Sequence, residues 1–572
     1  MTPEETFAAL VGDGDMVLDR FDACVAHRPA KAFLHYGEND VTLSFAQVRE
    51  RTDCIAGGLA AAGVRPGDRV CVFSRNALLS VLAMLAIWRV GAVFAPINFY
   101  YKGRLLAYQV RDTAPAAIIT DLASASLFEA VREDIGAQFF IVHSPRPGDH
   151  DHDPAASHAG FAGQRVCDLA ELEAGHMAPP QVRPGPGDIA NIIYTSGTTG
   201  PAKGVVQPYR WMNQYSFLPR QFMNEDDVIY TDLPMYHVGA AFFAVTRALW
   251  NANTVALWDR FSPTRFWDRI CATGATNCIL VDVMIPWLMN APPDPRDRAN
   301  PLRLVHMQPL PSNHHAVAQR FGIDFFTVGF GQTETGLGFC ALIDSLLDGG
   351  GTPAGLYRGL PPDAVRAVAA RLDIVQVRGD TSLPKGFMGR ASPLLDATVL
   401  DAADRTCPDG EVGQLAFRPR FEHLMLKEYF NKPEVTAKAF ANGWFHTGDA
   451  ARRMPDGSFE FIDRLGGFLR VRGENISSYQ IEDLLNGHPN IQAVAVVPVS
   501  AVVGDEEDVA VFIELRAGQT MTEAELHSYA QEVMPRFMQP KHVRFVDALP
   551  LTPTNKVEKY KLKQALLAEL AR

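Results

Sequence analysis

Residues 192–206 read IIYTSGTTGPAKGVV, and this stretch carries the strongest structural signal in the 572-residue chain. Its first residues are branched and aromatic, which is typical of a buried strand. Residues 195–200 are all glycine, serine or threonine, and Pro201, Ala202, Lys203 and Gly204 follow them. Small residues let backbone N–H groups surround phosphate oxygens, and a lysine adds a mobile positive charge. The spacing is not that of a Walker A loop. We therefore expect a strand that leads into a phosphate-binding loop of another kind.

Outward from this stretch, short apolar runs alternate with helical patterns. The runs lie at 69–74, 92–97, 116–120 and 139–143, and a helical pattern covers 43–63. This alternation predicts an α/β fold. The pattern starts again near residue 466, with strands expected at 493–499, 508–515 and 541–546 and a helix near 522–533. We expect a large N-terminal domain of α/β subdomains over 1–465 and a small α+β C-terminal domain over 466–572.

Composition excludes several classes of protein. Hydrophobic residues make up 47% and charged residues 21%, as in ordinary globular chains. A formal net charge of -12 argues against a general nucleic-acid binder, although the segment 536–572 is locally basic. The 8 cysteines are scattered without a CxxC pair, and the N-terminus lacks the pattern of a secretory signal. These features favour a cytoplasmic protein with reduced cysteines.

One apolar stretch is long enough to span a bilayer. It reads LLSVLAMLAIWRVGAVFAPI over residues 78–97, with Arg89 near its middle and Gly91 and Pro96 beyond. An arginine at that depth of a membrane is costly. We therefore expect a buried helix that ends at about Arg89, followed by a buried strand, and no membrane span.

Two segments have irregular composition. Residues 144–188 are rich in proline, histidine, aspartate and glycine, which predicts a surface loop. His150 and His152 form an H-x-H pair that could bind a metal, but a solvated loop is the favoured interpretation. The second segment covers about 344–385.

Four further segments follow the phosphate-loop candidate in order. They are GFGQTETG (329–336), GWFHTGD (443–449), FIDRLGGFLRVRGENISSYQIED (461–483) and LPLTPTNKVEK (549–559). Together the five resemble the ordered motifs of the acyl-activating, AMP-forming enzymes, which include acyl-CoA synthetases, luciferases and peptide-synthetase adenylation domains. FSPTRFW (261–267) and residues 321–335 resemble the carnitine-CoA ligase branch of this family.

The resemblance implies a two-step reaction. A carboxylate attacks the α-phosphate of ATP to give an acyl-adenylate and pyrophosphate, and the thiol of coenzyme A then displaces AMP. The first step brings negative groups together, so it needs cations and oriented dipoles. By resemblance, Lys556 is the catalytic lysine, and Glu334 and Thr195 are ligands of Mg²⁺. ATP, Mg²⁺ and coenzyme A are therefore the expected cofactors.

The same resemblance assigns the remaining contacts. Asp449 and Arg464 match the residues that bind the ribose. The residues matched to the phosphate and nucleotide site are Thr195, Ser196, Gly197, Thr198, Thr199, Gly200 and the catalytic Lys203, with Gly331, Gln332 and Thr333. In this family the C-terminal domain rotates about a pivot that falls here at Gly467. That rotation would bring Arg472, Gly473 and Glu474 towards the thiol.

The acyl side is expected at five residues, with 281–284 as a further wall. They are Tyr236, His237, Gly329, Phe330 and Gly331. The chain departs from the family at Asn555, where glycine is usual, and at Gln308 and Pro309, where glycines are often found. Asn tolerates positive φ better than most residues, so the turn at Asn555 is expected to survive. A different backbone at 308–309 would reshape the acyl pocket, so the acid itself is not readable from the sequence.

Three other functions stay open at this point. The long 344–385 segment lies broadly where fatty-acyl-AMP ligases carry an insertion, so an acyl-AMP ligase that passes the adenylate to a carrier protein is the main alternative. A luciferase-like oxidase and an inactive scaffold are the others, and the intact set of motif residues argues against the scaffold. The expected partners are a small carboxylic acid, ATP and coenzyme A, without nucleic acid, and a homodimer is left open.

Overall fold

The chain forms two compact units in a computed structural model. The structure describes residues 1–175, 178–195, 202–281, 284–308, 310–346, 351–384, 386–464, 468–471, 474–500, 507–534, 536–552 and 556–570. The first unit comprises Met1–Ala397 with Phe417–Trp444, and the second comprises Thr398–Ala416 with Phe445–Arg572. The expected domain boundary between residues 465 and 466 falls outside the described residues and stays a prediction.

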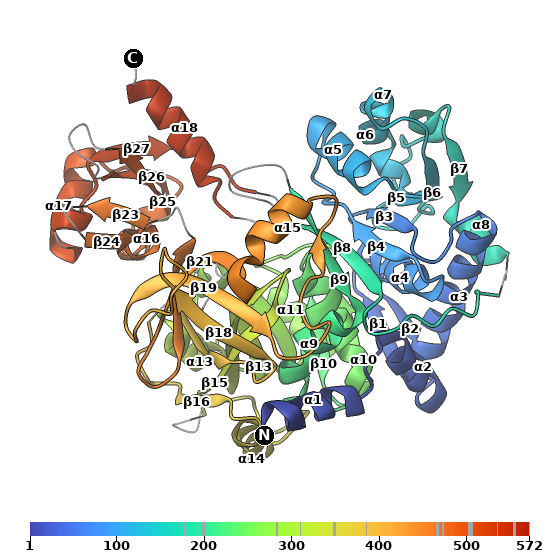
Figure 1. Cartoon of the computed structure of the whole chain (residues 1–572), viewed down its shortest axis with the longest axis horizontal. Coiled ribbons are helices and arrows are strands. Elements are labelled where there is room, and N and C mark those ends of the chain that lie inside the picture. Colours follow the sequence, from blue (N-terminus) through green and yellow to red (C-terminus); the bar gives the residue numbers. More distant parts are fainter. Residues whose placement is uncertain are drawn as a thin grey trace. The chain divides into compact units, whose positions relative to one another are not determined.

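An eight-stranded sheet in the first unit carries the predicted phosphate loop (Figure 1). Its order is β20-β9-β8-β4-β3-β5-β6-β7. The strands are β3 (Arg69–Phe73), β4 (Val93–Pro96), β5 (Ala117–Asp121), β6 (Phe139–His143), β7 (Arg165–Asp168), β8 (Ile189–Thr195), β9 (Lys203–Pro208) and β20 (Glu428–Tyr429). The segments around it are α3 (Phe45–Ala61), α4 (Ala77–Arg89), α5 (Gly103–Thr113), η1 (Leu122–Ser124), α6 (Ala125–Glu129), α7 (Arg132–Ile135), η2 (His158–Phe161), α8 (Leu169–Ala174), α15 (Pro433–Ala439) and η4 (Ala441–Gly443).

A second sheet in the same unit has the order β17-β15-β14-β13-β12-β10-β11-β1-β2, with β16 on β15. Its strands are β1 (Ala32–Tyr36), β2 (Val41–Ser44), β10 (Val228–Thr231), β11 (Thr254–Leu257), β12 (Asn277–Val281), β13 (Leu304–Gln308), β14 (Phe325–Gln332), β15 (Gly336–Asp344), β16 (Val375–Arg378) and β17 (Phe387–Ala391). Its helices are α1 (Pro3–Gly12), α2 (Val17–His27), α9 (Tyr209–Arg220), the π-helix η3 (Gly239–Thr246), α10 (Arg247–Asn251), α11 (Phe266–Thr273), α12 (Met284–Met289), α13 (His314–Phe321) and α14 (Pro362–Arg371).

The second unit contains the remaining strands and helices. They are β18 (Leu395–Leu400), β19 (Val412–Pro419), β21 (Phe445–Arg453), β22 (Phe459–Arg464), β23 (Phe468–Val471), β24 (Glu474–Ser477), α16 (Ser478–Asn486), β25 (Ile491–Ser500), β26 (Glu507–Leu515), α17 (Glu523–Val533), η5 (Arg536–Met538), β27 (His542–Val546) and α18 (Lys559–Leu570). The first residues of β18 and the last residues of β19 belong to the first unit. Helices α16 and α17 share one core with the sheet β25-β26-β27. Helix α17 begins at a capping box in which Thr522 and Glu525 satisfy each other's backbone N–H groups.

The predicted strands and helices are largely confirmed. The 78–97 stretch forms α4, which ends at Arg89, and then β4. Arg89 Nε lies 2.7 Å from Asp53, so its charge is paired inside the protein. Among the described residues no helix is both long and apolar enough to cross a membrane. The 344–385 segment is less irregular than expected, because it contains helix α14 and strand β16.

A buried ion pair joins the starts of strands β10 and β13. Arg303 Nη2 lies 2.7 Å from Asp227 Oδ1, and both side chains are fully buried. The carboxylate also accepts hydrogen bonds from Thr276 Oγ1 at 2.7 Å and from the backbone N–H of Asn224 at 2.9 Å. Gly359 closes over the pair with a φ of +90°, where an added Cβ would lie 2.5 Å from Arg303. Only glycine fits this close approach.

We predict that Arg303→Met destabilises the first unit by about 3–5 kcal/mol, because Asp227 stays buried without its cation. Urea unfolding followed by tryptophan fluorescence measures the loss. Arg265→Met is the control, because Arg265 is largely exposed and sits 3.7 Å from an equally exposed Asp268. An Arg303→Met midpoint equal to that of the control would contradict the prediction.

Candidate functional site

The predicted phosphate loop connects two antiparallel strands. Thr195 ends β8 and Lys203 begins β9, and the two face each other in register. Thr195 Oγ1 lies 3.5 Å from the carbonyl oxygen of Lys203. The predicted cradle residues Ser196, Gly197, Thr198, Thr199 and Gly200 lie outside the described residues. The expected strand before the loop is confirmed as β8, and the described ends of the hairpin hold the hydroxyl and the ammonium on either side of it.

A segment that sequence reasoning missed ties this hairpin to the Thr-Glu motif. We call residues 426–430 the bridging segment. The N–H of Leu426 donates to the Glu334 carbonyl at 2.8 Å, and the N–H of Phe430 donates to the Gly204 carbonyl at 2.7 Å. Between them, β20 pairs antiparallel with β9. The bridging segment therefore fixes the distance between two motifs that are far apart in sequence.

At the bridging segment, Tyr429 contacts two of the predicted site residues, Glu334 and Lys203. The Tyr429 hydroxyl donates to Glu334 Oε1 at 3.0 Å. Lys203 Nζ lies 5.1 Å from the centroid of the Tyr429 ring. A carboxylate and an ammonium beside a phosphate loop are suited to a nucleotide and its metal, because oxygen ligands are those that Mg²⁺ prefers.

A metal at Glu334 would need ligands from elsewhere. In the described part of the chain, no group of three or more histidine, cysteine, aspartate or glutamate residues could hold a metal ion. Mg²⁺ in nucleotide enzymes typically takes one or two carboxylates, phosphate oxygens and water. One carboxylate at Glu334 fits that pattern, with the Thr195 hydroxyl as a second expected contact.

The turn that carries Glu334 is anchored from two sides. Gln207 on β9 donates to the Thr333 carbonyl at 2.8 Å, and Gln308 on β13 donates to the Gly331 carbonyl at 3.3 Å. Gln332 lies between them at the end of β14. At Gly329 an added Cβ would lie 2.3 Å from the carbonyl oxygen of Phe339, so the motif requires glycine there. The hydrogen bonds hold the motif's backbone against both sheets.

The expected acyl-side residues fall into two apolar clusters. Tyr236 is buried beside the β8–β9 hairpin, in a core that contains Ile192 and Val206. Its ring lies edge-on to Phe99 at 5.0 Å and 4.7 Å from His237. Phe330 is also buried, and the centroid of its ring lies 6.2 Å from that of Phe339 and 6.3 Å from that of Phe417.

His306 is a buried polar residue that the sequence analysis did not single out. It lies on β13, two residues before Gln308, with Nδ1 3.1 Å from Thr327 Oγ1 and its ring 4.6 Å from Phe243. Burial lowers the pKa of His306 to about 4, so the imidazole is neutral near pH 7. Gln308, which was expected to reshape the acyl side, links two parts of this region. Its Oε1 lies 3.5 Å from His306 Nε2, and its Nε2 donates to the Gly331 carbonyl.

The ribose and lysine motifs lie in the second unit. Asp449 on β21 is opposite Arg464 on β22 in the backbone register, and the Asp449 side chain is buried. Lys556 is exposed on a turn in which its N–H donates to Thr552 Oγ1 at 3.1 Å. Glu474 lies on β24, whereas Arg472, Gly473, Gly467 and Asn555 lie outside the described residues. Their roles stay predictions.

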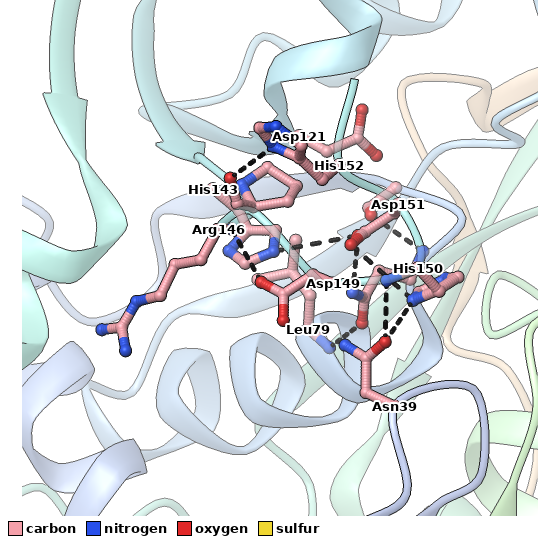
Figure 2. Close-up of polar contacts among 12 residues, drawn as sticks. Asn39, Leu79, Asp121, His143, Arg146, Asp149, His150, Asp151 and His152 are labelled. Carbon is pink, nitrogen blue, oxygen red and sulfur yellow. Dashed lines mark hydrogen bonds and ion pairs between the residues drawn. The ribbon is translucent and has the colours of Figure 1, made fainter. Parts of the chain in front are cut away.

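Both histidines of the H-x-H pair contact other residues of the protein (Figure 2), and within the described ranges they belong to no group of three or more histidine, cysteine, aspartate or glutamate residues that could hold a metal ion. His150 Nε2 lies 2.8 Å from Asp259, and His150 Nδ1 lies 3.0 Å from Asn39 Oδ1. His152 instead has Nδ1 3.2 Å from the carbonyl oxygen of Pro145. His150 thus fastens the surface loop to the body of the first unit and is not the solvated side chain expected.

We predict that the contribution of His150 to stability depends on pH. The hydrogen bond to Asp259 raises the pKa of His150, although burial opposes it, and the charges of Asp259, Asp151 and Glu38 add to the rise. Because the pKa is higher in the folded state, protonated His150 stabilises the fold. This contribution is complete at pH values below the unfolded-state pKa of about 6.5, and it is lost as the pH rises through the higher folded-state pKa. His150→Gln should therefore lower the melting temperature more at pH 6 than at pH 8.5.

His152→Gln, in the same loop, is the control for this experiment. Its partner is a carbonyl rather than a carboxylate. A melting-temperature loss in His150→Gln that stays constant between pH 6 and pH 8.5 would contradict the prediction.

Comparisons with known proteins agree with this arrangement. The model of the family described as AMP-binding enzyme matches residues 21–430, and that of the AMP-binding enzyme C-terminal domain matches residues 480–556. A crotonobetaine/carnitine–CoA ligase of Salmonella paratyphi B is 27% identical over 529 residues, which cover 91% of this chain and 93% of that protein.

Solved structures show the same fold. ATP-bound MatB from Rhodopseudomonas palustris superposes with a TM-score of 0.75 at 23% identity, covering 96% of this chain and 99% of that one. The anthranilate CoA ligase AuaEII in complex with anthranoyl-AMP superposes with a TM-score of 0.77 at 19% identity, covering 97% and 98%. The predicted α/β fold, with a large N-terminal and a small C-terminal domain, is confirmed.

Proposed function

This chain belongs to the AMP-binding enzyme family, and from that membership we propose that it is an ATP-dependent acyl-CoA synthetase. It converts a carboxylic acid, ATP and coenzyme A into an acyl-CoA thioester, AMP and pyrophosphate. The observation that carries the proposal is the meeting of Lys203 and Glu334 across Tyr429, beside the phosphate-loop hairpin.

In the first half-reaction, a carboxylate oxygen attacks the α-phosphorus of ATP. A bond forms between that oxygen and phosphorus, and the bond to the pyrophosphate oxygen breaks. The two reactants repel each other because both are negative, so positive groups must be placed in advance. We assign Lys203 to the phosphates and, by resemblance to the family, Lys556 to the contact with the carboxylate and the α-phosphate. Mg²⁺, held by Glu334 and Thr195, would neutralise charge on the phosphates.

Asp449 and Arg464 have a separate task. Opposite positions on paired strands β21 and β22 suit them to hold the two ribose hydroxyls. The carboxylate accepts hydrogen bonds from the hydroxyls, and the guanidinium donates to them. With the ribose fixed in this way, the α-phosphate meets the carboxylate in one orientation.

In the second half-reaction, the thiol of coenzyme A attacks the acyl carbon, and AMP leaves. By resemblance to the family, we assign the pivot to Gly467 and the thiol path to Arg472, Gly473 and Glu474, with Lys556 withdrawing for this step. The relatives at 27% identity are named CoA ligases, which supports coenzyme A over a carrier protein as the acceptor. A cytoplasmic location, where ATP and coenzyme A are available, completes the proposal.

Lys556→Ala should lower pyrophosphate release by about 10²–10³-fold, the cost of removing one charge-stabilising donor. The fold should be unaffected, because surface substitutions usually change stability by less than about 0.5 kcal/mol. A coupled pyrophosphate assay and a melting curve read the two effects. Lys563→Ala, on helix α18, is the matched control. Unchanged pyrophosphate release in Lys556→Ala would argue strongly against the proposed reaction.

A panel of carboxylic acids, each tested with and without coenzyme A, identifies the acid and the acceptor together. We expect at least one acid to release pyrophosphate and, with coenzyme A present, to yield a thioester detectable by mass spectrometry. Pyrophosphate release without any thioester would mean that the acceptor is not coenzyme A.

A further inference from the structure

Tyr429 lies between the two oppositely charged groups of the proposed nucleotide site. Its hydroxyl donates to Glu334 Oε1 at 3.0 Å, and the ammonium of Lys203 faces its ring at 5.1 Å from the centroid. We propose that Tyr429 is a positioning residue that keeps Glu334 and Lys203 apart and aims each at its own ligand. The proposal rests on the proposed function, because it concerns the metal and phosphate groups of that site.

The position of Tyr429 is fixed by its backbone. The N–H of Tyr429 donates to Thr436 Oγ1 at 2.9 Å, and the N–H groups of its neighbours Lys427 and Phe430 donate to carbonyls of β9 at 2.8 and 2.7 Å. The tyrosine side chain itself is buried. A side chain held in this way presents its hydroxyl and its ring in one orientation, as a preorganised site requires.

The hydroxyl acts on Glu334. A phenol O–H that donates to one carboxylate oxygen orients the group. A carboxylate held in one orientation is better placed to serve as a ligand of a cation. Loss of the hydroxyl alone should therefore weaken the response to Mg²⁺ while the rest of the site stays in place.

The ring acts on Lys203. An aromatic face attracts an ammonium without neutralising it. The contact of Lys203 Nζ with the Tyr429 ring therefore leaves its charge available to a phosphate. If the ring were replaced by a smaller side chain, Lys203 and Glu334 could approach and neutralise each other. Loss of the ring should therefore weaken the binding of ATP as well as the response to Mg²⁺.

Two substitutions separate these roles. Tyr429→Phe removes the hydroxyl and keeps the ring, whereas Tyr429→Leu removes both. Tyr357→Phe is the matched control, because it removes a hydroxyl that donates to the Leu360 carbonyl at 2.6 Å elsewhere in the first unit. The full-length proteins are compared by pyrophosphate release against Mg²⁺ at saturating ATP and acid, and against ATP at saturating Mg²⁺. Melting curves check that each variant is folded.

We expect Tyr429→Phe to raise the Mg²⁺ concentration for half-activation by about tenfold, as for a lost hydrogen bond to a charged group. Its KM for ATP at saturating Mg²⁺ should stay within about twofold of the wild type, and kcat should largely recover there. Tyr429→Leu should raise both values. In a Glu334→Gln background, Tyr429→Phe should cause little further change, because the carboxylate that it orients is gone.

An unchanged Mg²⁺ curve in Tyr429→Phe, or a lower kcat that Mg²⁺ does not restore, would overturn the inference. The inference would also be overturned if Tyr429→Phe shifted the Mg²⁺ response as much in the Glu334→Gln background as in the wild type. If the wild type released no pyrophosphate with any acid, the proposed function would fail instead. In that case, calorimetric titration of ATP at a series of Mg²⁺ concentrations measures binding without turnover. Tyr429→Phe should then need a higher Mg²⁺ concentration than the wild type to bind ATP. An equal Mg²⁺ dependence of ATP binding in the two proteins would overturn the inference on its own.

Discussion

The pairing of strand β9 with Glu428 and Tyr429 is the constraint on which the proposed site depends. A phosphate loop made of small residues has little side-chain surface with which to pack against its surroundings. Its hairpin is therefore held on both edges, by β4 beside β8 and by β20 beside β9. Because the bridging segment also bonds to Glu334, the loop and the carboxylate are set by one piece of backbone. The geometry of the charged groups follows from ordinary strand pairing.

This arrangement divides the chemistry between two parts of the chain. The first unit carries Lys203, Glu334 and the loop, which suit a triphosphate, and the second carries Lys556 and the Asp449–Arg464 pair. A lysine on an exposed turn can enter for the step in which negative charges meet and leave for the step in which a thiol needs room. The folded core contributes rigidity, as in the buried Arg303–Asp227 pair, whereas Lys556, the proposed catalytic lysine, is exposed.

Local patterns predicted much of the fold, and long-range partners account for most of what they missed. The strand before the loop follows from its branched and aromatic residues, and the helix ending at Arg89 follows from the arginine, glycine and proline that interrupt an apolar stretch. The bridging segment does not, because a two-residue strand has no period, and Tyr429 and Glu334 are 95 positions apart. His150 looked solvated for the same reason, since its partner Asp259 lies 109 positions away. His306 was not singled out, because a histidine within an apolar run gives no local sign of its hydrogen-bond partner or of its role.

The central claim is that a carboxylate oxygen attacks the α-phosphorus of ATP. An acid that supports turnover, prepared with ¹⁸O in its carboxyl group, tests this directly when the AMP produced is analysed by mass spectrometry. The account predicts one ¹⁸O atom in AMP, because the attacking oxygen stays on phosphorus when the thiol takes the acyl group. AMP without the label would contradict it.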